Sequence, residues 1–258
     1  MKPRGRLCVK LLENKIAIVT GAGQGIGRAL AKGLAAEGAK VVIAELNGDN
    51  GARVAKDIEA AGGIALAVRT DVSNEESVNA MVTETLRAFK NIDILINDAA
   101  IFPASSVAEM KNEEWEQVLR TNLTGTFFCA RAAMPTMKKN RAGRIINFTS
   151  GRALAGSAHG AHYAASKGGI IGFTKSLALE LAPYGITVNS ICPGAIDTPQ
   201  PKAHVKSEEE FYAKAKKIPL GRVGQPEDLV GPALFLASHW SAYVTGQMIV
   251  VNGGSILW

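Results

Sequence analysis

The sequence predicts an α/β protein, a single domain built on a parallel β-sheet with helices on both faces. Short, almost continuously apolar runs alternate with longer segments of helical periodicity, and no linker or internal repeat divides the 258 residues. Parallel strands buried on both faces have such continuous apolar runs, and regular strand–helix alternation is typical of these sheets. The length suits one domain with a sizeable core.

Seven apolar runs have the length of strands. We expect strands at 16–19, 41–44, 64–68, 92–96, 145–148, 186–191 and 248–251. The clearest helical patterns between them span 28–37, 75–89, 113–137 and 164–181. Residues 1–11 form a basic N-terminal extension, and the domain spans 12–258. The extension lacks the long apolar segment and the cleavage site of a signal peptide.

Charge and cysteine content narrow the function classes. The net charge is +6 and the pI is about 9.2, but the basic residues are scattered rather than gathered in one block. We therefore expect no nucleic-acid partner. No run approaches the ~18 apolar residues of a membrane span, so we expect no membrane partner. Three cysteines without a CxxC pair fit reduced thiols in a cytoplasmic protein.

A glycine-rich turn follows the first expected strand and precedes a helix. Glycines let the backbone turn tightly and approach a pyrophosphate, while the helix N-terminus offers free N–H groups. A tight structural turn is the alternative, because the strict GxGxxG spacing is not met. The strand–turn–helix position is nevertheless the one that a dinucleotide motif requires. The segment reads Thr20-Gly21-Ala-Gly23-Gln24-Gly25-Ile26-Gly27.

The second expected strand ends at Glu45, 24 residues after Gly21. A carboxylate near this spacing can accept hydrogen bonds from an adenosine ribose and would repel a 2′-phosphate. Gln24 and Leu46, where a reader of a 2′-phosphate would lie, carry no positive charge. We therefore expect NAD rather than NADP as cofactor. The alternative is that Glu45 only caps the strand end in solvent.

The next two strand ends carry weaker signals. Asp71 and Val72 could meet the adenine edge, or Asp71 could belong to a helix cap, because Ser73 and Glu76 resemble a capping box. Small residues after the fourth strand would let the chain pass close to the nucleotide. They lie in the segment Asn97-Asp98-Ala99-Ala100.

The fifth apolar run leads to a candidate proton-transfer site. Ser150 follows this run, and Tyr163 and Lys167 are spaced i, i+4, which places them on one face of a helix. A free tyrosine titrates near pH ~10, and a neighbouring ammonium lowers that pKa towards neutrality. Ser150 could then hold a substrate oxygen while Tyr163 moves the proton. The alternative is a solvated helix face.

In this order and spacing, the motifs resemble those of the short-chain dehydrogenase/reductase family over residues 12–254. The resemblance implies a Rossmann-type sheet of seven parallel strands and a catalytic tetrad. It also implies a homotetramer or, less commonly, a dimer. The motifs that carry it are Thr20-Gly-x-x-x-Gly-x-Gly27, Asn97-x-Ala99, Asn122, Ser150, Tyr163-x-x-x-Lys167, Pro193-Gly194 and Val251-Asn-Gly-Gly254.

The resemblance also implies a role for each tetrad member. Tyr163 as phenolate would take the alcohol proton while hydride passes to the nicotinamide, and Ser150 would orient the substrate oxygen. Lys167 would stabilise the phenolate and bind the nicotinamide ribose. Asn122 would hold a water linked to Lys167, or else only distort its helix. The expected cofactor contacts are Gly21, Gln24, Gly25, Ile26, Gly27, Glu45, Leu46, Asp71, Val72, Asn97, Ala99, Tyr163, Lys167, Pro193, Gly194, Ile196 and Thr198.

One segment departs from the family pattern, which usually has Asn-Asn-Ala-Gly at 97–100. Asp98 places a charge where an amide is usual, and Ala100 adds a methyl group. If the backbone at Ala100 needed a positive φ, this substitution would be costly.

Residues 195–217 are expected to form a substrate lid, which includes His204. His159 and His162 lie near the pocket but lack a third ligand at suitable spacing, so we expect no metal site. Residues expected to line the substrate pocket are Phe102, Ala153, Leu154, Ala158, His159 and His162.

The resulting expectation is an NAD(H)-dependent dehydrogenase or reductase acting on a small secondary alcohol or ketone. An NADPH-dependent 3-oxoacyl-[acyl-carrier-protein] reductase is the alternative, although Glu45 fits NADPH poorly. A non-catalytic nucleotide-sensing or scaffold protein is a third possibility. The intact tetrad argues against it, since a sensor need not keep Tyr163 and Lys167 together.

Overall fold

The computed structural model describes residues 10–202 and 207–257. It confirms the predicted fold class, because seven parallel strands form one sheet in the order β3-β2-β1-β4-β5-β6-β7. The strands are β1 Ile16–Thr20, β2 Lys40–Glu45, β3 Ile64–Arg69, β4 Ile94–Asn97, β5 Gly143–Phe148, β6 Ile186–Pro193 and β7 Met248–Val251. The strand order reverses between β1 and β4, and ligands of such sheets bind beyond the carboxyl ends at this point.

Helices connect the strands. The longer ones are α1 Gly25–Ala36, α2 Gly48–Ala60, α3 Glu75–Phe89, α4 Asn112–Leu119, α5 Gly125–Asn140, α7 Ala161–Leu181 and α10 Val230–Ala237. Shorter helices are α6 Arg152–Ala155, α8 Pro199–Lys202 and α9 Glu208–Ala213. Single turns are η1 Arg120–Thr124, η2 Ala182–Tyr184, η3 Lys214–Lys217, η4 Pro226–Leu229 and η5 His239–Ser241.

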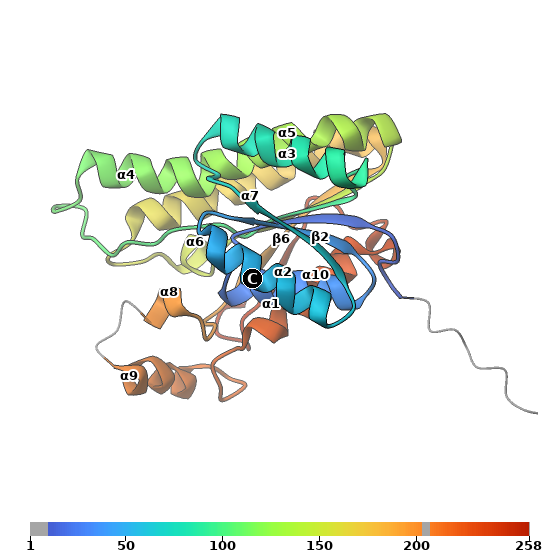
Figure 1. The fold of residues 1–258 in the computed structure, drawn as a ribbon. Helices are drawn as coiled ribbons and strands as arrows, with labels where there is room; N and C mark the ends of the chain where they lie inside the picture. The colour runs from blue at the N-terminus through green and yellow to red at the C-terminus, as the bar shows by residue number, and fades with distance from the viewer. Residues whose placement is uncertain (1–9, 203–206, 258) are drawn as a thin grey trace, which may run out of the picture.

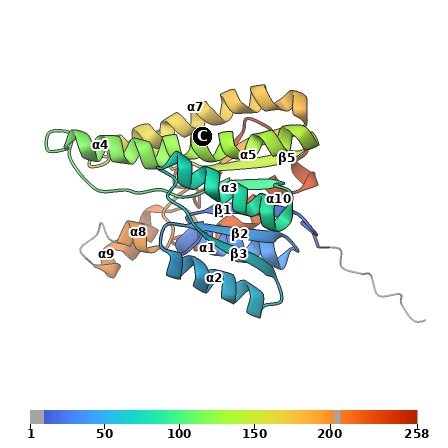
Figure 2. The ribbon, with the colours of Figure 1, turned by 45° about the horizontal axis from the view of Figure 1, so that its top comes forward.

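The helices form two layers, with α3, α5 and α7 on one face of the sheet and α1, α2 and α10 on the other (Figures 1 and 2). Successive side chains of a strand point to opposite faces. In β1, Val19 packs in the cluster that contains Leu34 of α1, whereas Ile18 packs in the cluster that contains Met81 of α3 and Leu177 of α7. Each face of the sheet therefore has its own buried core.

The expected helix over 113–137 is wrong as one continuous element. A π-helical turn, η1, separates α4 from α5. The side chain of Asn122 in this turn bonds to the loop after β4: its Oδ1 accepts from the Ile101 N–H at 2.9 Å, and its Nδ2 donates to the Ile101 carbonyl at 3.0 Å. These two bonds tie the turn to the site edge of the sheet.

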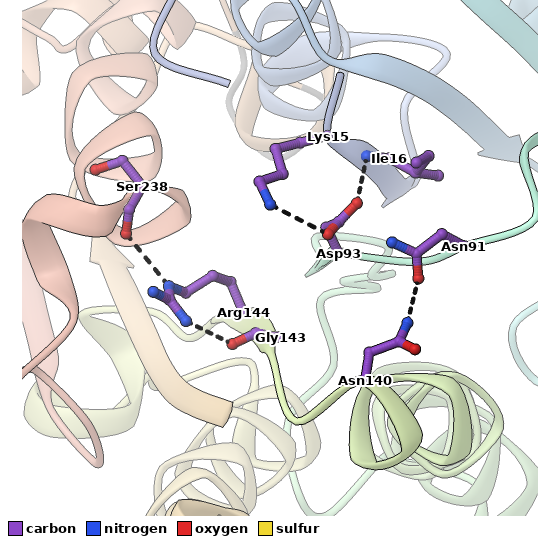
Figure 3. Close-up of polar contacts among 8 residues, drawn as sticks. All are labelled: Lys15, Ile16, Asn91, Asp93, Asn140, Gly143, Arg144 and Ser238. Carbon is purple, nitrogen blue, oxygen red and sulfur yellow. Dashed lines mark hydrogen bonds and ion pairs between the residues drawn. The ribbon is translucent and has the colours of Figure 1, made fainter. Parts of the chain in front are cut away.

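Polar contacts tie the opposite, amino-terminal edge of the sheet together (Figure 3). Asp93 accepts a hydrogen bond from the Ile16 N–H at 2.9 Å and pairs with Lys15 at 3.4 Å, which joins the starts of β1 and β4. Arg144 in β5 donates to the Ser238 carbonyl at 3.2 Å. This edge is therefore occupied by structural contacts.

Most of the predicted extension, residues 1–9, lies outside the described residues, as does His204 of the predicted lid. Leu11, at the end of the extension, packs against the core, and Leu12 is fully buried in it. Among the described residues, no helix is long and apolar enough to cross a membrane. Cys129 and Cys192 are buried free thiols.

Candidate active site

The strands β1, β2, β4, β5 and β6 end at one edge of the sheet, where a cavity of about 350 Å³ opens. This size lies at the lower end for small-molecule sites. Its lining includes Ile26, Asp98, Ala100, Phe102, Phe148, Ser150, Arg152, Ala155, Gly156, Tyr163, Lys167, Pro193, Gly194, Ile196, Thr198, Gln200, Pro201, Phe211, Ser255 and Ile256. The cavity thus brings together three of the four predicted tetrad members and Ile26, Pro193, Gly194, Ile196 and Thr198 of the predicted cofactor contacts.

The glycine turn needs its glycines. Gly21 and Gly25 have φ angles of +67° and +53°, which favour glycine. A Cβ on Gly27 would lie 2.3 Å from the Gly21 carbonyl oxygen, and one on Gly25 would lie 3.2 Å from the Thr198 side chain. Larger residues would therefore force this turn apart. The glycine cradle at the start of α1, with the free N–H groups of a helix N-terminus, fits a dinucleotide phosphate.

Glu45 faces this turn rather than open solvent. Its carboxylate accepts a hydrogen bond from the Gly23 N–H at 2.9 Å and another from the Asn47 N–H at 3.1 Å. Gln24 and Leu46 beside it are exposed. The alternative that Glu45 only caps the strand end in solvent is thus wrong, because its negative charge is held against the glycine turn.

Asp98 lies at the junction of the turn and the predicted catalytic residues. Its carboxylate accepts a hydrogen bond from the Gly27 N–H, and burial raises its pKa to about 7 against the opposing effects of the Lys167 ammonium and this bond. Ala100 does not have a positive φ, so the backbone cost considered for this substitution does not arise. The family departure therefore changes charge rather than backbone strain.

Replacing Asp98 with Asn should remove a pH dependence of stability. An unfolded aspartate has a pKa near ~3.9, while that of Asp98 is raised to about 7. Between these values the folded state holds the proton that the unfolded state releases, so the wild type loses stability as the pH rises. We expect D98N to melt roughly 2–4 °C above the wild type near neutral pH, with a smaller difference near pH ~4.5.

Thermal unfolding at both pH values measures this effect. Glu116→Gln, an exposed carboxylate on α4, is the matched control. The same difference in melting temperature between D98N and the wild type at both pH values would contradict the prediction.

The side chain of Asn97 bonds within the sheet, and contact of Asn97 with the cofactor stays a prediction. Its Nδ2 donates to Asn147 Oδ1 at 2.9 Å, and Asn147 in turn donates to Thr174 on α7 at 2.9 Å. Ala99 lies against Gly21, where a Cβ on the glycine would be 2.9 Å from the Ala99 Cα. Ala99 therefore contacts the glycine turn, whereas the Asn97 side chain links β4 to β5.

Asp71 and Val72 also have structural contacts. Asp71 accepts hydrogen bonds from the Ser73 N–H at 2.9 Å and from the Ser73 hydroxyl at 2.6 Å, and Val72 is buried against Gly125. The proposed Ser73–Glu76 capping box is wrong, because Asn74 is the N-cap of α3. Contact of Asp71 and Val72 with an adenine stays a prediction.

Ser150, Tyr163 and Lys167 meet at the cavity wall. The Ser150 hydroxyl is hydrogen-bonded to the Tyr163 phenol, and it accepts the Arg152 N–H at 3.2 Å. The Lys167 ammonium donates to the Phe148 carbonyl at 2.8 Å and lies 5.7 Å from the centroid of the Tyr163 ring. A hydroxyl, a phenol and an ammonium therefore face one small cavity.

The expected acidification of the phenol is wrong for this structure. Burial raises the pKa of Tyr163 to about 12, and the opposing influences are the Ser150 bond and the Arg152 charge. Burial also lowers the pKa of Lys167 to about 8, although the Asp98 carboxylate opposes this shift. Tyr163 is thus a proton donor at neutral pH, and its ability to accept a proton increases with pH.

Asn122 is fully buried and does not line the cavity. Besides its bonds to Ile101, its Nδ2 donates to the Ser166 hydroxyl at 3.1 Å, on the helix that carries Tyr163 and Lys167. The helix distortion expected at Asn122 is present as the π turn η1, and the bond to Ser166 ties this turn to α7. The water relay through Asn122 stays a prediction.

The predicted substrate lining is only partly right. Phe102 lines the cavity, but Ala153, Leu154, Ala158, His159 and His162 do not. His162 is buried, with Nδ1 accepting the Tyr163 N–H at 2.8 Å and Nε2 lying 3.1 Å from a Glu114 carboxylate oxygen. No group of three or more His, Cys, Asp or Glu side chains suited to a metal ion occurs in the part of the chain that the structure describes.

The lid segment does border the cavity, through Gln200, Pro201 and Phe211. Lys202 in α8 pairs with Glu208 in α9 at 3.1 Å and so links these two helices of the lid segment. It also pairs with Asp197 at 2.8 Å. Sequence reasoning missed the lining by Arg152, Ser255 and Ile256. Arg152 could have been found, since it follows Ser150 by two residues at a strand end. The tail residues carry no motif.

Comparison with known proteins agrees with this geometry. Residues 21–255 match the family described as enoyl-(acyl carrier protein) reductase. The chain is 42% identical over 243 residues to the 3-oxoacyl-[acyl-carrier-protein] reductase FabG of Vibrio cholerae, covering 94% of this chain and 98% of that protein.

Two solved structures superpose with a TM-score of 0.90. One, a short-chain type dehydrogenase/reductase from Mycobacterium marinum, is 36% identical, covering 97% of this chain and 98% of that one. The other, a putative NAD(P) dependent gluconate 5-dehydrogenase from Beutenbergia cavernae with bound NADP, is 37% identical, covering 96% and 98%. The chain therefore belongs to the short-chain dehydrogenase/reductase family of oxidoreductases.

Proposed function

We propose that this protein catalyses reversible hydride transfer between NAD(H) and a small secondary alcohol or ketone. The observation that carries the proposal is the meeting of Ser150, Tyr163 and Lys167 at one cavity beside the glycine turn. The glycine cradle would hold the cofactor phosphates, and Pro193, Gly194, Ile196 and Thr198 border the space for its nicotinamide. When bound, the nicotinamide supplies or accepts the hydride.

The protein residues handle the proton. In reduction, Ser150 holds the carbonyl oxygen and Tyr163 donates its phenolic proton to that oxygen as the hydroxyl forms. In oxidation, the deprotonated phenol accepts the hydroxyl proton, and its high pKa makes this direction faster as the pH rises. The buried ammonium of Lys167 stabilises the phenolate that reduction leaves behind. Initial rates at a series of pH values in both directions measure this asymmetry.

Glu45 supports NAD(H) as the cofactor, although the Beutenbergia neighbour was solved with bound NADP. Its carboxylate is fixed over the glycine turn by two backbone N–H groups. A 2′-phosphate beside this fixed negative charge would be repelled, whereas ribose hydroxyls can donate to it. We expect the wild type to use NADH with a higher kcat/KM than NADPH.

Replacing Glu45 with Gln should lower this preference about tenfold, because the repulsion is removed while one acceptor oxygen for the Gly23 N–H remains. The ratio of kcat/KM for NADH to that for NADPH is the quantity measured. Glu116→Gln on α4 again serves as the matched control. A wild type that prefers NADPH, or a ratio that E45Q leaves unchanged, would overturn the cofactor assignment.

A second candidate is reduction of a 3-oxoacyl-[acyl-carrier-protein]. It is favoured by the 42% identity to the Vibrio cholerae reductase over nearly the whole chain. NADH and NADPH consumption with a 3-oxoacyl thioester, compared with small ketones and alcohols, separates the two candidates. Turnover confined to the thioester would establish the second one.

A homotetramer is also proposed. Leu179 of α7 is 80% exposed and Phe127 of α5 is 38% exposed, on the two long helices where the family places subunit contacts. Light scattering after gel filtration measures the mass of the assembly.

A further inference from the structure

Arg152 is a cationic residue of the cavity wall that the proposed proton transfer does not use. It follows Ser150 by two residues and begins the short helix α6. Its guanidinium carbon lies 4.4 Å from the centroid of the Phe102 ring, and that ring lies 4.7 Å from the Tyr163 ring, centroid to centroid. Arg152 and the phenol therefore contact the same aromatic side chain within one small cavity.

The three charged residues of the lining, Asp98, Arg152 and Lys167, have different partners. Asp98 and Lys167 influence each other, and each has a backbone partner, Gly27 and Phe148 respectively. Arg152 donates to the neutral Ser157 hydroxyl, and in the described ranges no carboxylate forms an ion pair with it. A guanidinium has five N–H donors in a planar fork that suits a carboxylate.

The surroundings of Arg152 limit the size and nature of its ligand. Ala155, Gly156, Pro201 and Ile256 contribute small or apolar surface to the lining. The cavity of about 350 Å³ must also take the nicotinamide end of the cofactor. Arg152 provides one guanidinium charge, which matches a monoanion better than a phosphate dianion.

We propose, on the basis of the proposed function, that the substrate is a small secondary hydroxy acid or the matching oxo acid, whose carboxylate binds Arg152 while Ser150 and Tyr163 hold the reacting oxygen. In oxidation, the carbinol C–H bond breaks and its hydride reduces NAD⁺ to NADH. The hydroxyl O–H bond breaks, its proton passes to Tyr163, and the C=O bond of the oxo acid forms. Reduction reverses each change.

The test compares acidic and neutral substrates of the same length. Wild type and R152M are assayed with hydroxy acids that carry the hydroxyl on the second, third or fourth carbon. The matching oxo acids and the neutral amides of both are assayed beside them. Methionine keeps an unbranched chain against Phe102 while removing the charge. We expect the wild type to prefer the acids. In R152M, KM for the preferred acid should rise about 10- to 100-fold, with values for the amides within about threefold.

Two further variants make the result specific. R152K retains the charge but not the planar fork, so its KM for the acid should fall between the values of wild type and R152M. R87M removes an exposed arginine on α3, whose side chain is 75% exposed, and controls for a change in net charge. Circular dichroism and NADH binding confirm that each variant is folded.

The outcomes are distinguishable. If R152M raised KM equally for the acids and the amides, Arg152 would have only a structural role and the inference would be overturned. Turnover of ketones or sugars without any of the acids would also overturn it while the proposed function stands, whereas turnover confined to thioesters would overturn it in favour of the second candidate function. Absence of turnover for every class with both cofactors, despite NADH binding, would refute the proposed function and this inference with it.

Discussion

Tyr163→Phe should lower kcat/KM by about 100- to 10,000-fold, the range that a general acid or base contributes, while NADH still binds. The phenol is the proton donor that faces the cavity, and its hydroxyl is bonded to Ser150. Phenylalanine retains the ring that packs 4.7 Å from Phe102, so the shape of the wall is kept. Steady-state NADH consumption and NADH fluorescence titration measure the two quantities separately.

Tyr243→Phe is the matched control, because Tyr243 is fully exposed and this substitution removes the same hydroxyl group at a position away from the site. It should leave kcat/KM unchanged. If the Y163F variant stayed within tenfold of the wild type, another group would have to supply the proton and the proposed role of Tyr163 would fail.

Gly27→Ala should weaken NADH binding at least about tenfold and lower the free energy of unfolding by roughly 1–3 kcal/mol. The new Cβ would lie 2.3 Å from the Gly21 carbonyl oxygen and 2.8 Å from its carbonyl carbon. Both are backbone atoms, so the turn itself must shift. That shift would also disturb the bond from the Gly27 N–H to Asp98.

NADH titration and urea denaturation measure both effects. Gly231→Ala on α10 is the control, since nothing lies within 4 Å of its new Cβ. That variant should bind NADH as the wild type does. Wild-type affinity in G27A would show that the turn does not shape the cofactor site.

Local sequence patterns predicted the parallel sheet because a strand buried on both faces must be apolar, whatever its neighbours are. The run at 186–191 became the fully buried β6, Ile186–Pro193, which lies between β5 and β7. The same patterns failed at 113–137, where helical periodicity continues through a π turn. That turn is stabilised by bonds from Asn122 to Ile101 and Ser166, which are distant in the sequence.

The sequence by itself determined the fold, the glycine turn and the residues that meet at the strand ends, because parallel strands bring their carboxyl ends to one edge. Only the tertiary structure decided their electrostatics, since burial depends on everything packed around a group. In the folded protein, burial raises the pKa of Tyr163, where an isolated Tyr–Lys pair predicted a lower one. The side chain of Asn97 bonds to Asn147 within the sheet. The tertiary structure also placed Arg152 at the wall beside Phe102, a contact between residues fifty positions apart that no local pattern encodes.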